Sequence, residues 1–241
     1  MPISIRRRNV HAWQGTITQQ GVRLMMRQGL TVADTVETWV MGWAVSRCTP
    51  PPVEKPWGFY IEVAGKAVEV GRHVLPETDE SLVRRAAASV TAPRTWMKMP
   101  GEPEEIEPWL SPGWVMAYEE TGHLMATDLK VTHPVEPEGY TVTVETIGSV
   151  IHARVHDAGG RQAAQGQMAV VAEAAVADQV VTDDAHRRRG LGRFVMRTLA
   201  DHALKEGAHV GVLGATDAGR ALYETLGWTK HATLAEAVYR P

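Results

Sequence analysis

The amino-acid sequence predicts an α+β fold: a twisted, mixed and mostly antiparallel sheet flanked by helices, with an N-terminal α/β extension. Two observations support this class. Several short β-prone runs follow one another between residues 114 and 181, whereas helical and strand-like periods take turns after residue 190. The 241 residues, 44% of them hydrophobic, are enough for a substantial core in one large or two smaller domains.

Charge and cysteine content narrow the classes of function. The formal net charge of -3 gives no global reason to expect binding to nucleic acid or to an anionic membrane. Cys48 is the only cysteine, which excludes an internal disulfide and a thiolate zinc cluster. No run approaches the roughly 20 apolar residues of a membrane span, and the N-terminus lacks the apolar core of a signal peptide. We therefore expect a cytoplasmic protein.

The first elements are predicted to be a helix and a β-hairpin. Residues 31–46 place apolar side chains on one helical face, and Thr31 with Asp34 forms an N-terminal capping pattern. The proline run that follows ends this helix. Residues 58–63 and 66–75 are β-prone and are joined by a short turn, which predicts a hairpin.

A second helix and a linker complete the N-terminal part. Thr78 or Asp79 is suited to cap a helix that follows at once. Residues 99–112 then contain four prolines and four glutamates, a composition typical of a linker. We place the domain boundary there, which divides the chain into an N-terminal α/β region, residues 1–112, and a second domain, residues 113–241.

The second domain is predicted to begin with strands. Residues 114–118 and 123–131 flank a turn and read as a second hairpin. A further strand starts at Tyr140, and β character continues through residues 150–155. Residues 163–181 are mostly small or branched and are long enough for two strands with a turn between them.

Helices and strands alternate in the last third of the chain. A helix is predicted over residues 191–205, a strand over 209–213 and a final strand over 232–239. Between the two strands, Thr216 or Asp217 caps another helix. The residues expected to face inward from that helix are Ala218, Ala221, Leu222 and Leu226.

A loop rich in arginine and glycine links the strand before residue 182 to the helix after residue 190. Gly190 and Gly192 have no side chains, which allows a ligand or another segment to approach the backbone closely. Free backbone N–H groups and the positive end of a helix dipole favour phosphate or pyrophosphate. The sequence lacks the lysine of a P-loop and the third glycine of a dinucleotide loop. The arginines that add charge here are Arg187, Arg188, Arg189 and Arg193.

Two motifs taken together resemble one family. The segment Arg187-x-x-Gly190-x-Gly192 resembles the acetyl-CoA pyrophosphate loop of the GNAT N-acetyltransferase superfamily. Residues 221–228, ALYETLGW, are similar to that superfamily's downstream LYExLGF/W signature. The resemblance covers residues 140–239. It implies the GNAT fold, acetyl-CoA as co-substrate and acyl transfer to an amine.

The sequence departs from the superfamily pattern in one respect. A GNAT domain usually has two helices between its first two strands, whereas the strand from Tyr140 runs almost directly into the next one. The helices must therefore come from elsewhere in the chain. The N-terminal half is either a degenerate, tandem second copy of the fold or a replacement for the missing segment.

The resemblance also implies how acetyl-CoA binds. In the superfamily, the strand before the loop splays from its neighbour, and its free backbone groups bind the pantetheine arm like an added strand. That strand here contains Val180, Val181 and Thr182. The pyrophosphate contacts are carried onto Arg187, Arg188, Arg189, Gly190, Leu191, Gly192 and Arg193.

Two residues are candidates for acid and base catalysis. Tyr223 occupies the tyrosine position of the downstream signature and is our candidate for the acid that protonates the departing thiolate; the alternative is a packing role. Asp178 lies on the strand that leads to the loop and is our candidate for the general base, with Glu173 as an alternative. Asp178 is equally compatible with a turn or surface role, and many such enzymes use no single base.

The histidines and tryptophans are more typical of structural roles than of catalytic or metal-binding ones. His152 and His156 spread along a strand, so we predict no metal site, and His186 is typical of a surface residue. Trp39 and Trp43 share a helical face and are predicted to be core residues. The tryptophans that either fill an interface or line an acceptor pocket are Trp57, Trp96, Trp109 and Trp114.

The sequence thus predicts an N-acetyltransferase that moves the acetyl group of acetyl-CoA to a primary amine of a small molecule by direct attack in a ternary complex. Two alternatives stay open. One is transfer of a longer acyl chain, or transfer to a protein or peptide; the other is a module that senses acyl-CoA without turnover. No nucleic-acid or membrane partner is expected, and an exposed tryptophan surface would indicate a homodimer.

Overall fold

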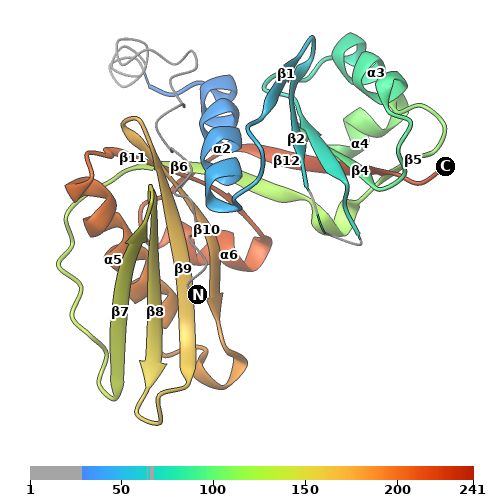
Figure 1. Ribbon diagram of the computed structural model, residues 1–241. Helices are drawn as coiled ribbons and strands as arrows, with labels where there is room; N and C mark the ends of the chain where they lie inside the picture. Colours follow the sequence, from blue (N-terminus) through green and yellow to red (C-terminus); the bar gives the residue numbers. More distant parts are fainter. Residues whose placement is uncertain (1–28, 64, 66–67) are drawn as a thin grey trace, which may run out of the picture.

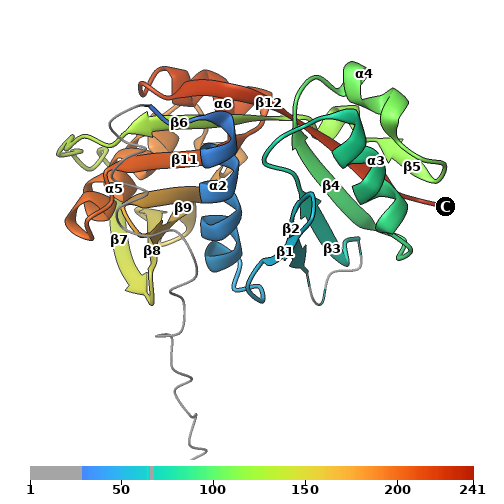
Figure 2. The same ribbon diagram turned by 90° about the horizontal axis from the view of Figure 1, so that it is seen from above.

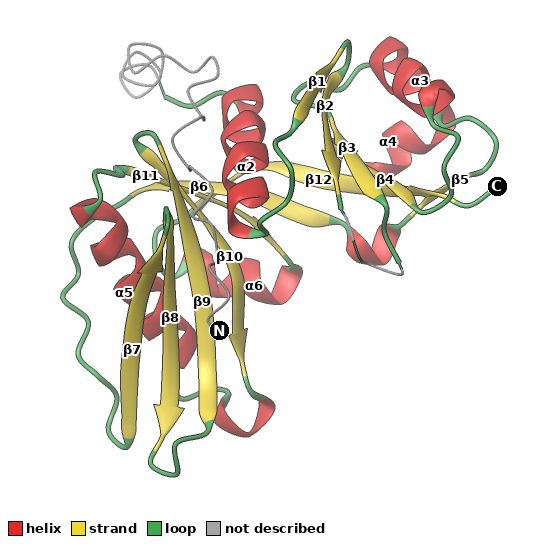
Figure 3. Ribbon diagram, in the orientation of Figure 1, coloured by secondary structure: helices red, strands yellow, loops and turns green. Residues whose placement is uncertain are grey.

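Strand β12 (Thr229–Tyr239) lies near the middle of the sheet and joins the N-terminal and C-terminal parts of the chain (Figures 1 and 3). The computed structural model describes residues 29–63, 65 and 68–241. Within them, twelve strands form one sheet in the order β1-β2-β3-β4-β12-β6-β11-β10-β9-β8-β7, with β5 also paired to β12. The predicted α+β class, a mixed and mostly antiparallel sheet flanked by helices, is confirmed.

The first predicted elements are confirmed. Helix α2 (Val32–Ser46) starts at a full capping box, in which Thr31 and Asp34 each accept from the other's backbone N–H. Strands β2 (Gly58–Glu62) and β3 (Gly71–Val74) pair antiparallel, and β1 (Val53–Lys55) extends this edge. Residues 64 and 66–67 of the predicted turn and strand start lie outside the described residues. Helix α3 (Glu80–Ser89) is capped by Asp79.

The segment predicted as a linker contains regular structure. Strand β4 (Thr95–Pro100) runs parallel to β3 and antiparallel to β12, and helix α4 (Pro103–Ile106) and the 3-10 helix η1 (Glu107–Trp109) follow. Pro103 occupies the first turn of α4, where a missing N–H costs no hydrogen bond. Whether residue 112 divides two domains, and whether the N-terminal half is a second copy of the fold, stay predictions.

The second predicted hairpin is wrong. Strands β5 (Trp114–Met116) and β6 (Gly122–Asp128) are separated by the 3-10 helix η2 (Tyr118–Glu120) and do not pair with each other. Both pair with β12, β5 with residues 237–239 and β6 with residues 229–234. The long β12 offers each strand a partner that the local turn pattern does not reveal.

The remaining strands follow the prediction closely. Strands β7 (Tyr140–Ile147), β8 (Val150–Asp157), β9 (Gln162–Val171) and β10 (Ala174–Thr182) form an antiparallel meander. The 3-10 helix η3 (Asp184–His186), helix α5 (Leu191–Lys205), strand β11 (Val210–Ala215) and helix α6 (Asp217–Glu224) complete the chain before β12.

The predicted inward face of α6 is wrong in part. Ala218 and Ala221 are exposed, and Leu222 and Leu226 are only half-buried. Tyr223 is the buried residue, with its ring 6.0 Å from that of Trp228. Helix α6 packs against β6 and β11, and Tyr223, in its last turn, is its buried residue.

Two helical layers cover the C-terminal part of the sheet. Helix α5 packs on one face of β8, β9 and β10, and α2 packs on the other face of β9, β10 and β11. Figure 2 shows α2 between this part of the sheet and strands β1–β3. Trp39 and Trp43 are each 5% exposed, which confirms their predicted place in the core. In the described part of the chain, no helix combines the length and apolar character that a membrane crossing requires.

Candidate functional site

Strands β10 and β11 begin as a parallel pair and then separate. Their ladder joins Ala174, Ala175 and Val176 to residues 210–212 and ends there. Beyond it, β10 continues to Thr182 paired only with β9, and β11 continues to Ala215 paired only with β6. The edge of β10 after Val176 therefore presents backbone groups to the gap, as a strand does when it receives an added strand.

A β-bulge interrupts β10 inside this gap. The register with β9 shifts between Asp178 and Val181, and Gln179 has a left-handed φ of 53°. Before the bulge, Asp178 points toward α2. After it, Val180 packs against the core under α5, Val181 is exposed and Thr182 lies beside Gly192. The bulge thus turns the end of β10 toward the arginine-glycine loop.

The loop after β10 leaves the first turn of α5 uncapped. Gly190 is the N-cap, has a φ of 79° and provides no side chain to accept from the helix amides. Arg188 is also left-handed, with a φ of 62°. A Cβ on Gly190 would meet no atom within 4 Å, so its surroundings are open. Free amides at a helix N-terminus, next to open space, suit an anionic group.

The arginine side chains of the loop contact different partners. Arg187 pairs with Asp184 at 2.6 Å on the surface, and Arg193 donates to Thr225 Oγ1 at 3.3 Å. Arg189 donates to the Tyr140 hydroxyl at 3.1 Å. Leu191 is 1% exposed, so only its backbone amide is available to a ligand. Arg187 and Arg193 thus already have protein partners, whereas the backbone amides at the start of α5 have no side-chain cap.

Tyr223 lies on the α6 side of the gap. Its hydroxyl makes no hydrogen bond to any other described residue. Burial, with a further contribution from the charge of Asp178, raises the pKa of Tyr223 to about 12. The phenol is therefore fully protonated near neutral pH, and its hydroxyl can donate a hydrogen bond to a ligand.

Asp178 lies on the α2 side and is occupied by partners from α2. Arg47 donates from Nε to Oδ2 at 2.5 Å and from Nη2 to Oδ1 at 2.8 Å. The Ser46 hydroxyl donates to Oδ2 at 2.8 Å, and Gln167 in turn donates to Ser46. The Asp178 side chain is 11% exposed. Glu173, the alternative base, lies at the start of β10, at the opposite end of that strand from the loop.

A cavity of about 300 Å³ opens between the end of α2 and the bulge. Trp43 forms one wall, and the Arg47 guanidinium lies 5.5 Å from the centre of its ring. Arg72 stacks on the same ring at 4.1 Å. The other residues that line this cavity are Ser46, Cys48, Thr49, Pro50, Val63 and Gln179. The cavity meets the gap at Gln179, on the face of the sheet opposite α5 and α6.

The comparisons with known proteins agree with this geometry. The model of the Acetyltransferase (GNAT) family matches residues 91–228, more than half of the chain. The chain belongs to the Acetyltransferase (GNAT) family. Acyl-CoA is the acyl donor in this family, so the chain is an acyltransferase. The chain matches no curated protein.

Solved structures share the fold of this GNAT acetyltransferase. A GCN5-related N-acetyltransferase from Kribbella flavida is 16% identical, with a TM-score of 0.63, and the match covers 86% of this chain and 95% of that one. A GCN5-related N-acetyltransferase-like protein from Streptococcus suis is 13% identical, with a TM-score of 0.56, and the match covers 91% and 99%. The GNAT fold is therefore shown along most of the chain.

The residues present fit an acyl-CoA donor. The uncapped amides of α5 and the open space at Gly190 suit its pyrophosphate, and the unpaired edge of β10 suits its amide-bearing arm. Two further residues that contact predicted site residues were missed by the sequence interpretation: Arg47, which pairs with Asp178, and Tyr140, which accepts from Arg189. No local pattern marks them; Arg47 and Asp178 are 131 positions apart.

Proposed function

We propose that this GNAT acetyltransferase transfers the acetyl group of acetyl-CoA to a primary amine of a small molecule by direct attack in a ternary complex. The observation that carries the proposal is the separation of β10 from β11 directly beside the uncapped N-terminus of α5. The arm of acetyl-CoA follows the free edge of β10 at Val180, Val181 and Thr182. Its pyrophosphate meets the amides of residues 190–193.

The two substrates are proposed to bind on opposite faces of the sheet. Helices α5 and α6 occupy the face that carries the donor loop and Tyr223. The cavity at Trp43 opens on the other face and meets the same gap. The amine therefore approaches from the α2 side while the thioester is held from the α5 side. A cavity of about 300 Å³ is at the small end of ligand pockets, which favours a small acceptor.

Tyr223 is the proposed acid. The amine nitrogen attacks the thioester carbonyl, the new C–N bond forms, and the C–S bond breaks with its electron pair on sulfur. The Tyr223 hydroxyl donates a hydrogen bond to that sulfur and transfers its proton as the thiolate leaves. The amide nitrogen loses one proton to solvent, and Tyr223 regains one. Since the pKa of Tyr223 is about 12, the phenol holds its proton until negative charge develops on the sulfur.

Asp178, the base candidate of the sequence interpretation, is proposed to act mainly through its charge. The Asp178 carboxylate accepts two hydrogen bonds from the Arg47 guanidinium and one from the Ser46 hydroxyl, so these protein donors already occupy its oxygens. Its charge keeps Arg47 at the wall of the acceptor cavity and favours the protonated form of Tyr223. The amine then loses its first proton to water before attack.

The experiment that tests this function is calorimetric titration with acetyl-CoA, followed by a thiol-release assay over a panel of small primary amines and short peptides. Micromolar binding with release on one class of small amine is the expected result. Release only with peptides would replace the small acceptor by a protein, and release only with longer acyl donors would replace the acetyl group. Binding without release on any acceptor would indicate a sensor, and absence of binding would overturn the donor site.

A further inference from the structure

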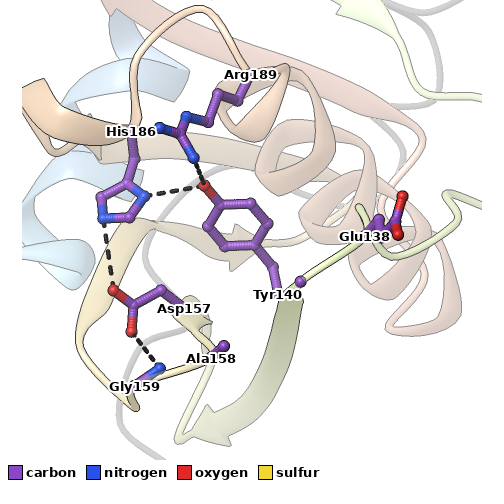
Figure 4. A pocket seen from close by; sticks show the side chains of 8 residues that line it. Glu138, Tyr140, Asp157, Ala158, Gly159, His186 and Arg189 are labelled. Carbon is purple, nitrogen blue, oxygen red and sulfur yellow. Dashed lines mark hydrogen bonds and ion pairs between the residues drawn. The ribbon is translucent and has the colours of Figure 1, made fainter.

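A second cavity, of about 310 Å³, differs in charge from the cavity at Trp43. It lies where the start of β7, the β8–β9 turn and the loop after η3 come together, and both acidic and basic side chains line it (Figure 4). Its lining residues are Glu138, Gly139, Tyr140, Asp157, Ala158, Gly159, His186 and Arg189. His186, which the sequence favours as a surface residue, has a side chain only 12% exposed, so that expectation is wrong. By contrast, Arg47 is the one charged residue among the described residues that line the cavity at Trp43.

The Arg47 guanidinium is held along one edge, and its other edge is unused. Nε and Nη2 donate to the two oxygens of Asp178 at 2.5 Å and 2.8 Å, and the centre of the Trp43 ring lies 5.5 Å from the guanidinium carbon. Both hydrogens of Nη1 and the second hydrogen of Nη2 have no acceptor among the residues that the structure describes. At this end of the guanidinium, two parallel N–H bonds match the two oxygens of one carboxylate.

The carboxylates near Arg47 do not line the cavity. The Asp178 side chain is 11% exposed and is not one of the described lining residues, whereas that of Arg47 is 30% exposed and is one of them. Arg72 is held by Glu69 through two hydrogen bonds of 2.6 Å, and both of these side chains are almost buried. The cavity therefore meets the positive side of the pair that Arg47 forms with Asp178.

Gln179 is a second open polar group of the same cavity. It lies in the bulge of β10, where the cavity meets the gap proposed to hold the thioester. Its side-chain amide makes no hydrogen bond to another described residue, so its oxygen can accept from an amine. The lining hydroxyls are already used, since Ser46 donates to Asp178 and Thr49 donates to the Pro50 carbonyl at 3.0 Å. Arg47 and Gln179 thus provide the polar groups that a ligand can use.

We propose that the acceptor is an amine that also carries a carboxylate, an amino acid, with the unused edge of Arg47 as the ligand of that carboxylate. The inference rests on the proposed function, because it needs the acceptor in the cavity at Trp43. Arg47 is bound to the residue directly before Gln179, so the two polar groups lie close together and suit an amine and a carboxylate separated by few bonds. No described lining residue is acidic, so the additional ammonium groups of a polyamine find no opposite charge there. Arg47 is thereby a specificity-determining residue.

The test compares kcat/KM for matched pairs, each made of an α-amino acid and the amine that it gives on decarboxylation. The wild type is expected to prefer the amino acid about tenfold or more, as one charge-assisted contact provides. The double variant Arg47→Gln, Asp178→Asn removes both charges, leaves no buried carboxylate unpaired and should bring the ratio close to one. Asp178→Asn alone keeps the guanidinium and should retain the preference, even where KM rises for both acceptors. Arg84→Gln, which removes a charge paired with Glu80 on the surface of α3, should leave the ratio unchanged.

A second variant and a binding measurement keep the test decisive. Arg47→Lys retains the charge without the planar pair of N–H bonds and should lower the preference only in part. Calorimetric titration of the complex with CoA needs no turnover, and amino acids should bind to the wild type about tenfold more tightly than to the double variant.

The outcomes separate this inference from the proposed function. Equal kcat/KM within the pairs, or a preference that survives in the double variant, would overturn the carboxylate assignment, whereas acetyl transfer would still stand. Thiol release only with phosphate-bearing amines would also overturn it and assign Arg47 to a phosphate. Binding of amino acids that depends on Arg47, without thiol release on any amine, would instead overturn the proposed function and keep this site.

Discussion

Arg47 and Asp178 form a two-point ion pair, with Nε–Oδ2 at 2.5 Å and Nη2–Oδ1 at 2.8 Å. The pair joins the residue after α2 to the residue that begins the bulge of β10. Arg47 also stacks on Trp43, which forms a wall of the cavity proposed for the acceptor. One carboxylate thus connects the strand proposed to hold the donor with the pocket proposed to hold the acceptor.

Replacing Asp178 by asparagine should reveal this connection. Asp178→Asn removes the charge that Arg47 pairs with and is expected to lower the free energy of unfolding by about 1–3 kcal/mol. The KM for the amine should rise more than kcat falls, and the pH dependence of kcat should keep its shape. Ser46→Ala, which removes one hydrogen bond to the same carboxylate, is the milder control. A loss of kcat above about a hundredfold, with the acid limb gone, would restore Asp178 as the general base.

Tyr223→Phe isolates the proposed acid. The hydroxyl has no hydrogen-bond partner among the residues that the structure describes, so its removal should leave stability nearly unchanged. Turnover should fall by about a hundredfold while the Kd of acetyl-CoA stays the same. In the wild type, no loss of kcat attributable to this phenol is expected until the pH nears its pKa of about 12. Unchanged turnover in stopped or steady-state assays would remove Tyr223 from the mechanism.

Two substitutions at Gly190 that are similar in size but differ in charge test the proposed anion site. Its left-handed φ is one that asparagine and aspartate tolerate best among residues with a side chain, and no atom lies within 4 Å of the added Cβ. Gly190→Asp is expected to weaken acetyl-CoA binding about a hundredfold or more, because it places a negative charge at the proposed pyrophosphate position. Gly190→Asn, similar in size and neutral, should cost much less. Equal binding by the two folded variants in calorimetry would contradict the loop assignment.

Cys48 provides a test of direct attack. It is the only thiol of the chain, is exposed and lines the cavity proposed for the acceptor. A mechanism with a covalent acyl-cysteine would need it, whereas attack in a ternary complex does not. Cys48→Ser should therefore retain full turnover, and initial-rate plots against both substrates should intersect. Parallel plots, together with an inactive variant, would favour a covalent intermediate.

His73 predicts acid sensitivity of the N-terminal part. Burial, and then the charge of Lys55, lowers the pKa of His73 to about 4, and its Nδ1 accepts from Trp57 Nε1 at 3.1 Å. Between pH 6.5 and 4 the unfolded chain binds a proton that the folded chain refuses, so stability falls as the pH falls through this window. The loss amounts to about 3 kcal/mol at its lower end. His73→Asn keeps an acceptor for Trp57 and should lack this component. Urea titrations at pH 4.5 and 7 give the change in the free energy of unfolding between these pH values. The same change in the wild type and in the variant would contradict the prediction.

Local patterns were sufficient for most elements. The capping box at Thr31 and Asp34, the cap at Asp79 and the limits of α5 depend on contacts within a few residues, and the structure contains all of them. The meander from Tyr140 to Thr182 follows from short turns between β-prone runs. The hairpin expected around residue 121 failed because its partner, β12, lies more than a hundred residues later in the chain.

The sequence by itself determined the family and the turn into α5 at Gly190 and Gly192, because each rests on a short motif with its own backbone geometry. Tertiary structure alone decided which side chains from distant parts of the sequence lie in contact. It paired Arg47 with Asp178, brought Tyr140 within hydrogen-bond distance of Arg189 and His186, and turned Tyr223 rather than Ala221 into the core. The physical reason is distance along the chain: such side chains meet only when the packing of β10, β12 and α2 brings their elements together, and no local period encodes that packing.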